Sequence, residues 1–264
     1  MQSRDDPVLL SVQDGVAQVR FNRPAALNAI DQPLADRFLQ VCERLSARDD
    51  VRVVVVSGEG KGFMAGGDVA GMRASMPHAD EFIAGLLASI NPALLLLAAM
   101  PAPVLASLHG AVAGAGVSIA LGADLAIAAD DTRFNLAYAG IGATPDAGST
   151  WVLPRLVGLR RALEIALLSD PIDATTALRI GLVNRVVPRA ELERETQALA
   201  ERLAAGPTAA YGRIKNLMRA SYDQTLRQQM DAEVAAFRAS THTSDFAEGI
   251  AAFGDKRRPR FVGR

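Results

Sequence analysis

Cysteine and histidine are scarce in this sequence, and their scarcity excludes several kinds of site. Cys42 is the only cysteine among the 264 residues, so an internal disulfide is impossible. It stands beside Val41 in an amphipathic pattern, where we expect an ordinary half-buried thiol. His78, His109 and His242 lack the spacing of metal ligands, so we expect no metal site. This cysteine usage fits a reducing compartment, and the expected location is cytoplasmic.

A surplus of charge of either sign is also missing. The net charge is −1, with acids and bases interspersed, and no basic run occurs before residues 256–258. Nucleic acid is therefore not an expected partner, because a face that binds it needs clustered Lys and Arg. Residues 1–6 lack the apolar core of a secretory signal, so we expect no targeting segment there.

Charged residues are absent altogether from Phe82 to Ala123, a stretch long enough to hold a membrane-spanning helix. Pro92, Pro101 and Pro103 interrupt this stretch, together with five glycines, and such residues break helices. We therefore expect short elements in the deep core of a soluble protein, and no membrane partner.

A nucleotide-binding loop is missing as well. The run Val51–Ser57 leads into residues 58–63, which begin like a G-x-G-x-x-G turn but carry Phe63 at the sixth position. No Gly-Lys-Ser/Thr ending follows to hold a phosphate and its metal. Chemistry that depends on a nucleotide cofactor is therefore not expected.

What the sequence does contain is a series of alternating elements. Residues 8–12 and 16–21 alternate apolar and polar side chains around Asp14-Gly15, which predicts a β-hairpin. Asp31 is placed to cap a helix whose apolar face holds Leu34, Phe38, Val41 and Leu45. Near-continuous apolar runs at 51–57, 104–108, 125–128 and 183–187 predict buried strands. The pattern indicates an α/β core of repeated strand-strand-helix units.

Beyond Pro188 the character of the chain changes. Residues 191–205, 209–222, 226–239 and 246–253 all suit helices, and strand signals disappear. We divide the chain into a core, residues 1–200, and a helical region, residues 201–264. The helical region carries more apolar positions than one thin layer needs, which favours either packing on its own core or contact with another subunit. These positions are Leu217, Met218, Met230, Val234, Phe237 and Phe246.

Residues 104–150 form the stretch around which the chain is organised. An apolar strand at 104–108 leads into a glycine-rich turn with Gly110, Gly114 and Gly116, and the turn opens a helix. A second such turn, residues 63–68, precedes a helix that Asp68 can cap. Helix starts leave N–H groups unpaired, and two such sources can grip one thioester oxygen. On spacing alone, turns with purely structural glycines are the simpler explanation.

Carboxylates are few around these turns. Between Glu81 and Glu164 the only acidic residues are Asp124, Asp130, Asp131 and Asp146. Asp146 stands just before Ala-Gly-Ser-Thr, where its carboxylate could cap a helix. It could equally serve as a general base, and position alone does not separate the two roles.

Six motifs together resemble the crotonase, or enoyl-CoA hydratase/isomerase, superfamily, and they occur in the family's order and spacing. The carboxy-terminal residues 253–261 are similar to the family's as well. The six motifs lie at residues 21–28, 63–68, 110–116, 124–129, 145–148 and 177–183. The resemblance implies a spiral of strand-strand-helix turns, a helical trimerisation region, and a homotrimer or hexamer.

The resemblance also implies acyl-CoA thioester substrates and no separate cofactor. By position, the oxyanion hole falls on the backbone N–H groups of Gly67 and Ala115. The CoA site implied by the family uses Ala25, Leu27, Ala65, Asp68, Val69 and, from a neighbouring subunit, Lys256. Two departures concern this machinery, because many relatives have a lysine where this chain has Ala25 and a glycine where it has Ala115.

A larger departure concerns the two glutamates of the hydratases, whose positions are taken here by Ser118 and Tyr138. Asp146 matches instead the aspartate of relatives that shift double bonds, including the isomerase that acts on the ring epoxide of phenylacetyl-CoA. We therefore expect an acyl-CoA isomerase with Asp146 as the proton shuttle. The alternatives are a hydratase with atypical residues and a non-catalytic acyl-CoA-binding protein. We expect Met72, Met76, Phe82 and Leu86 to form the acyl pocket's wall.

Overall fold

The strands of the chain are shared between two β-sheets in the computed structural model, which describes residues 6–264. The larger sheet has six strands in the order β1-β2-β3-β4-β6-β9, and only the β1–β2 pair is antiparallel. Its strands are β1 (Val8–Gln13), β2 (Val16–Phe21), β3 (Val53–Gly58), β4 (Val104–Leu108), β6 (Leu125–Ala129) and β9 (Arg185–Val187). The smaller sheet contains β5 (Ala111–Ala113), β7 (Arg133–Asn135) and β8 (Ile172–Asp173). Residues 1–5, on which most of the signal-peptide expectation rests, lie outside the described part.

Successive strands go to different sheets, and a helix follows each pair. β4 joins the large sheet, β5 joins the small one, and α4 (Ala115–Gly122) comes next. β6 and β7 divide in the same way before the 3-10 turn η2 (Ala139–Ile141) and α5 (Ser149–Val157). The predicted α/β core of strand-strand-helix units is therefore confirmed. The remaining short helices of this part are η1 (Pro24–Ala26), α2 (Val69–Ala74), α6 (Leu159–Leu168), α7 (Ala174–Arg179) and η3 (Arg189–Glu191).

The first hairpin and the first helix form where they were predicted. Asp14 and Gly15 both have positive φ, 50° and 79°, as a two-residue turn between twisted strands requires. The Asp31 carboxylate accepts the Leu34 N–H over 3.0 Å at the start of α1 (Gln32–Ser46), and the four predicted apolar residues of α1 are fully buried. Cys42 is fully buried as well rather than half-buried, because its place on α1 faces the core, and burial raises the pKa of its thiol.

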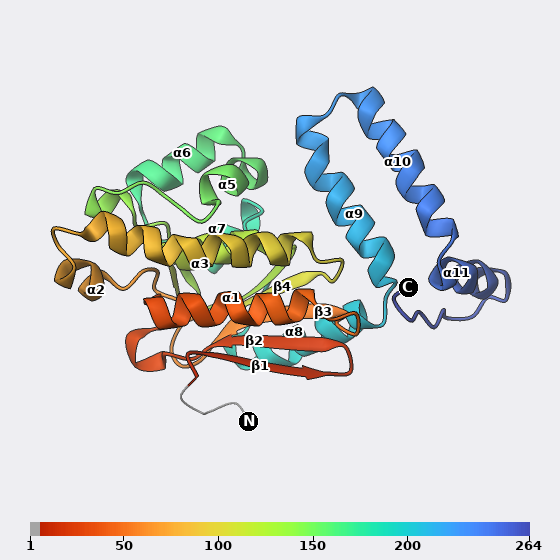
Figure 1. Ribbon diagram of the computed structural model, residues 1–264, viewed down its shortest axis with the longest axis horizontal. Coiled ribbons are helices and arrows are strands. Elements are labelled where there is room, and N and C mark those ends of the chain that lie inside the picture. The colour runs from red at the N-terminus through yellow and green to blue at the C-terminus, as the bar shows by residue number, and fades with distance from the viewer. Residues whose placement is uncertain (1–5) are drawn as a thin grey trace.

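β3 separates two cores, which confirms that it is buried on both faces. Val54 and Val56 pack in the larger core together with α1 and α3 (Ala79–Ala99). Val53 and Val55 point to the opposite face, where α8 (Leu192–Ala204) covers the sheet. A side chain of this size stabilises the fold by roughly 1.5–3 kcal/mol when it is fully buried. Figure 1 shows α1 and α3 lying side by side on one face and α8 below the strands on the other.

α3 corrects one sequence-based expectation. Pro92 was expected to interrupt any long helix, yet α3 continues through it from Ala79 to Ala99. The proline ring occupies an exposed position on α3, and the helix ends only before Pro101 and Pro103. Among the described residues, α3 is the one helix whose length and composition would allow it to cross a membrane. Its buried face, with Leu86, Ile90 and Leu97, packs into the protein core.

Three further short strands escaped or exceeded the sequence patterns. Residues 111–113 were read as part of a turn, but they form β5, because a three-residue strand is too short to show a period. β7 and β8 are missed for the same reason. β9 begins at Arg185 rather than at Val183, whose side chain packs in the large core just before the strand.

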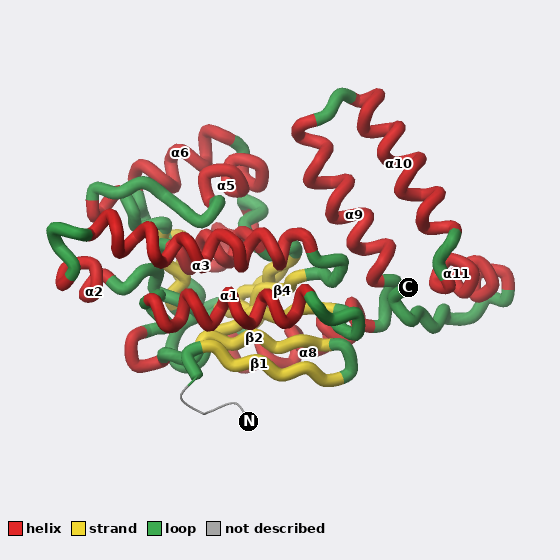
Figure 2. The backbone as a smooth tube through the Cα atoms, viewed as in Figure 1, coloured by secondary structure: helices red, strands yellow, loops and turns green. Residues whose placement is uncertain are grey.

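The last quarter of the chain consists of helices, as predicted. After α8 come α9 (Thr208–Ala220), the 3-10 turn η4 (Ser221–Asp223), α10 (Leu226–Thr241) and α11 (Ser244–Gly254). α9 and α10 stand beside the body as a pair, and α11 lies at the far end of the molecule (Figures 1 and 2). The division of the chain at residue 200 stays a prediction, and α8 continues past it to Ala204 on the sheet.

A buried ionic cluster attaches α9 to the body. The Lys215 ammonium lies 2.7 Å from the Asp124 carboxylate and donates to the carbonyls of Met100 and Ala102. Arg219 bonds the other Asp124 oxygen over 2.8 Å. Desolvation lowers the pKa of Lys215, and the neighbouring Asp124 carboxylate opposes that shift. Asp124 therefore balances two cations where the helical region joins the core.

Asp124→Asn should lower the free energy of unfolding by about 3 kcal/mol, because removing one partner of a buried ionic cluster leaves the others uncompensated. The measurement is urea unfolding followed by circular dichroism. The matched control is Glu164→Gln, which breaks the exposed Arg161–Glu164 pair and should cost less than about 1 kcal/mol. Equal losses in the two variants would contradict the role given to Asp124.

Candidate active site

Two glycine-rich turns meet backbone to backbone between the sheets. Gly66 belongs to the turn between β3 and α2, and Gly114 to the turn between β5 and α4. Both have positive φ, 97° and 50°, which residues with side chains rarely adopt. A Cβ added at Gly66 would lie 3.3 Å from the Gly114 Cα and 3.1 Å from the Ala113 carbonyl oxygen. Glycine at both positions is what lets the turns touch.

Backbone hydrogen bonds join the two turns into one unit. The Phe63 N–H donates to the His109 carbonyl over 2.9 Å, and the Met64 N–H donates to the Ala111 carbonyl over 3.1 Å. In return the Ala113 N–H donates to the Met64 carbonyl over 2.8 Å. The two segments that the sequence singled out separately are therefore held together by a small parallel ladder.

The amides of Gly67 and Ala115 are left without backbone partners. Ile30 bridges Gly67 through its neighbours, donating to the Gly66 carbonyl and accepting from the Asp68 N–H. The Gly67 N–H consequently points away from Ile30. Ala115 is the first residue of α4, so its N–H has no acceptor in a preceding turn. Within residues 6–264 neither amide has a backbone acceptor, and both residues line one pocket.

That pocket is small and largely apolar, with a volume of about 120 Å³. Most of its wall comes from α2 and α3, and Ile141 of η2 completes it. The wall residues from α2 and α3 are Val69, Met72, Ile83, Leu86, Leu87 and Ile90. A larger cleft of about 870 Å³, beside Arg52 and Arg264, contains none of the predicted site residues.

The predicted wall is correct for Met72 and Leu86 and wrong for Met76 and Phe82. Met76 is 66% exposed just beyond the end of α2, and Phe82 packs toward Gly71 instead of lining the pocket. The residues that were missed on α3 stand at 83, 87 and 90, which is the spacing of one helix face. Expecting Pro92 to interrupt the helix drew attention away from this periodic signal.

Asp146 reaches the pocket and does not cap a helix. α5 begins at Ser149 after Gly148, and no side chain caps it. The main-chain carbonyl of Asp146, not its carboxylate, accepts the Ser149 N–H and hydroxyl. The carboxylate instead accepts the Tyr138 hydroxyl over 2.5 Å, and the Ser118 hydroxyl lies 3.4 Å from the Tyr138 oxygen. The capping alternative for Asp146 is therefore wrong.

Burial controls the protonation of this pair. Desolvation raises the pKa of Asp146 above its usual range, and the hydrogen bond from Tyr138 works in the opposite direction. Desolvation and the nearby carboxylate raise the pKa of Tyr138, so the phenol keeps its proton. Among the described residues that line the pocket, Asp146 alone can carry a charge. The geometry supports one proton acceptor whose affinity for protons is raised.

The structure brings some of the predicted CoA-binding residues together. Ala65 and Val69 line the pocket. Ala25 and Leu27 belong to the exposed turn around η1, which joins the site because the Ala65 N–H donates to the Leu27 carbonyl over 2.9 Å. Asp68 caps α2 by accepting the Gly71 N–H over 3.0 Å, and no part of Asp68 lines the pocket.

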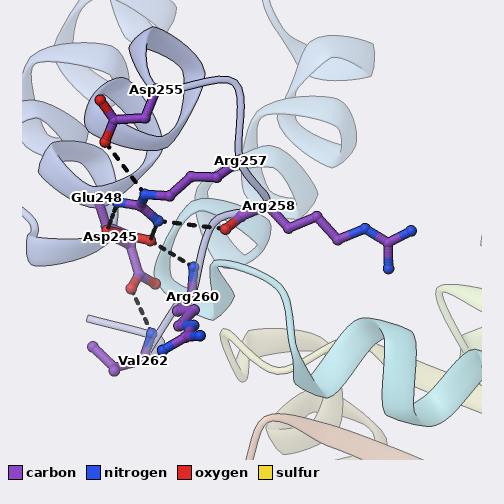
Figure 3. Close-up of polar contacts among 7 residues, drawn as sticks. All are labelled: Asp245, Glu248, Asp255, Arg257, Arg258, Arg260 and Val262. Atoms are coloured by element: carbon purple, nitrogen blue, oxygen red, sulfur yellow. Dashed lines mark hydrogen bonds and ion pairs between the residues drawn. The ribbon is translucent and has the colours of Figure 1, made fainter.

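Lys256 lies far from this chain's own pocket. It follows α11, at the opposite end of the long axis from α2 and the pocket (Figure 1). The tail around it is fixed, since the Arg257 guanidinium pairs with Glu248 through two bonds of 2.6 and 2.9 Å, and Asp245 accepts the Val262 N–H (Figure 3). The Arg257 bonds lower the pKa of Glu248 to about 2. A role for Lys256 at a neighbouring subunit's site stays a prediction.

Sequence analysis missed the side chain that connects the η1 turn to the first glycine turn. Asn28 is completely buried, and its amide donates to the carbonyls of Glu59, Gly62 and Phe63. Its oxygen accepts the Arg23 N–H over 2.8 Å. The signal that could have identified it is an asparagine ending the 21–28 motif, since Asn tolerates the left-handed φ of 59° found here.

The histidines do not gather at the site. His109 is buried and bonds the Gly60 carbonyl, while His78 and His242 end other helices. Burial lowers the pKa of His109. No group of three side chains able to hold a metal ion occurs in residues 6–264.

Comparison with known proteins decides the family. The family described as "Enoyl-CoA hydratase/isomerase" matches residues 11–264. The chain belongs to this family. The enoyl-CoA hydratase/isomerase family member is 36% identical over 253 residues to a probable enoyl-CoA hydratase of Rhodobacter capsulatus, covering 96% of each chain. It is 34% identical over 258 residues to the 1,2-epoxyphenylacetyl-CoA isomerase of Escherichia coli, covering 97% of this chain and 98% of that one.

A solved structure agrees with the family assignment. A putative enoyl-CoA hydratase/isomerase from Mycobacterium abscessus superimposes with a TM-score of 0.92 at 37% identity, covering 97% of this chain and all of that one. The crotonase fold expected from the sequence is confirmed. At the level that the relatives share, this family member is an acyl-CoA hydratase/isomerase, and their names divide between the two activities.

Asp146→Asn should not lower stability at neutral pH. A folded-state pKa raised above the unfolded value means that stability falls as pH rises through the window between the two values. Asn removes this loss and still accepts from Tyr138, so the variant's stability relative to the wild type should increase from pH 4 to pH 7. Urea unfolding at both pH values measures the difference.

Asp173→Ala provides the control with the opposite sign. Its carboxylate caps α7 by accepting the Thr176 N–H over 2.7 Å, and that bond lowers the pKa of Asp173. Its removal should destabilise the protein more at pH 7 than at pH 4, because a lowered pKa adds stability only to the ionised form. If Asp146→Asn followed the same trend as Asp173→Ala, the environment described for Asp146 would be incorrect.

Proposed function

We propose that this protein is an acyl-CoA isomerase that moves a carbon–carbon double bond, or rearranges an epoxide-derived equivalent, through a thioester enolate. The observation that carries the proposal is the single ionisable carboxylate of the pocket, Asp146, placed in one cavity with the free amides of Gly67 and Ala115. Resemblance to an isomerase of Escherichia coli over nearly the whole chain supports the same reading.

The proposed mechanism needs one base and one oxyanion site. The thioester oxygen accepts the N–H groups of Gly67 and Ala115, which stabilise the negative charge when a proton leaves carbon. Asp146 takes that proton from one carbon and returns it to another, so the reaction is balanced without a second reactant. Its raised pKa brings the base closer to neutral pH, where proton transfer in both directions is efficient. The proposal requires no metal and no redox cofactor.

Hydration is the competing activity, and the relative from Rhodobacter capsulatus keeps it in view. Adding water needs groups that hold the water, accept its proton and deliver a proton to carbon. The hydratase positions hold Ser118 and Tyr138, and the one proton of Tyr138 is already donated to Asp146. Neither side chain is a carboxylate, which favours isomerisation. A non-catalytic acyl-CoA-binding role is disfavoured because a base and free amides share the pocket.

The size of the pocket suggests the acyl group. A cavity of about 120 Å³ with apolar walls is comparable to the roughly 150 Å³ engineered cavity that binds benzene. We therefore propose an acyl group with a single ring or a comparably short chain beyond the reacting carbons. The name of the Escherichia coli relative, a phenylacetyl-CoA derivative isomerase, fits that size.

Asp146→Asn should reduce isomerisation of an enoyl-CoA by roughly a hundredfold or more, the scale of lost general-base catalysis. Binding of a saturated acyl-CoA should survive, because the amides and the pocket wall are unchanged. Parallel assays of isomerisation and hydration on the same enoyl-CoA measure both activities. Near-normal isomerisation by Asp146→Asn, or a wild-type protein that hydrates faster than it isomerises, would refute the proposal.

We further propose that the protein assembles as a trimer or a hexamer through α9 and α10. Several large apolar side chains of these helices and their connection are exposed, more than a monomer normally leaves in contact with water. They are Ile214, Met218, Tyr222, Leu226, Met230, Val234 and Phe237. Packing on the chain's own core, the other explanation of the sequence pattern, does not bury these residues.

The double variant Met218→Glu, Met230→Glu should dissociate the assembly, because it places charges on two side chains that are 69% and 56% exposed in the single chain. Light scattering at micromolar concentration should report an oligomer for the wild type and a monomer for the variant, with unchanged circular dichroism. Arg44→Glu, on the exposed side of α1, is the control and should remain oligomeric. A monomeric wild type would refute this assignment.

A further inference from the structure

We infer that Tyr138 is a positioning residue for Asp146: its hydroxyl holds one carboxylate oxygen and, through Ser118, connects the base to α4, the helix that carries the Ala115 amide. The inference rests on the proposed role of Asp146 as the base. It assigns a task to two residues that stand where the hydratases have glutamates, and this task differs from substrate binding.

The direction of the hydrogen bonds follows from the chemistry of the groups. An ionised carboxylate can only accept, so the Tyr138 proton is directed to Asp146 over 2.5 Å. The Tyr138 oxygen then has lone pairs left, and the Ser118 hydroxyl at 3.4 Å is the available donor. Ser118 is 1% exposed and no other partner is found for it among the described residues. The order is therefore Ser118 to Tyr138 to Asp146.

The scaffold on both sides of this chain of bonds is rigid. Ser118 lies three residues after Ala115, on the same face of α4. The main-chain carbonyl of Tyr138 accepts the N–H groups of Ile141 and Ala143, which fixes the backbone under the ring. The ring is 9% exposed and lines the pocket. The base and the Ala115 oxyanion donor thus share one mechanical reference.

Tyr138 is poorly suited to exchange protons with the substrate itself. Burial and the adjacent carboxylate raise its pKa, so a phenolate does not form near neutral pH. Its proton is committed to Asp146 Oδ1, which leaves Asp146 Oδ2 for proton transfer. The bond also limits how far desolvation raises the pKa of Asp146, which keeps the base ionised.

Tyr138→Phe separates this role from simple packing, because it removes the hydroxyl and keeps the ring. A hydrogen bond to a charged group contributes about 1.5–3 kcal/mol, so its loss should raise the pKa of Asp146 by about one pH unit or more. The acid limb of the kcat/KM profile should move upward by the same amount. At neutral pH kcat should fall by about tenfold, with KM little changed.

The titration of Asp146 can be read without any activity. Infrared spectra of the protonated carboxyl band, with Asp146→Asn as the blank, give its midpoint in wild type, Tyr138→Phe and Ser118→Ala. The last variant should move the midpoint in the same direction by less, and it serves as the second test if Tyr138→Phe does not fold. Circular dichroism and binding of hexanoyl-CoA check the integrity of each variant.

Identical midpoints in wild type and Tyr138→Phe would overturn the inference, whatever the activities are. An upward midpoint together with an upward acid limb would establish it. An upward midpoint in a protein that isomerises no enoyl-CoA would overturn the proposed function while supporting the bond's control of Asp146.

Discussion

The contact between two backbone turns is the constraint on which the site depends. Gly66 and Gly114 approach so closely that a Cβ on either would meet the other's Cα at 3.3–3.4 Å. A ladder between residues 63–64 and 109–113 maintains this approach. Because the two turns are joined, the amides of Gly67 and Ala115 reach one pocket from separate segments. No charged side chain is needed to grip the thioester oxygen, so preorganised backbone dipoles supply the stabilisation.

The second constraint is the scarcity of polar groups in the pocket. One carboxylate among apolar walls is desolvated, which raises its pKa and improves it as a base, but too much desolvation would leave it protonated. The Tyr138 hydroxyl opposes that excess. The replacement of two glutamates by Ser118 and Tyr138 therefore removes hydratase machinery and, in the proposed function, supports a different base.

The helical region obeys a different rule from the core. α8 buries its apolar face on the sheet, whereas α9 and α10 leave theirs exposed and are attached through the ionic cluster around Asp124. Sequence periodicity located all four helices because each has a strong period of 3.6 residues. Periodicity does not say which surface an apolar face meets, so the exposure of Met218 and Phe237 became visible only in the structure.

The sequence by itself determined the hairpin at Asp14-Gly15, the capped helix after Asp31, the buried strands, the glycine turns and, through its motifs, the family. These features depend on local backbone preferences and on residue order. Only the tertiary structure decided that Asp146 is no helix cap, that α3 continues through Pro92 to line the pocket, and that Tyr138 bonds Asp146. Each of these depends on which segments distant in sequence are packed together, and a local pattern carries no record of that packing.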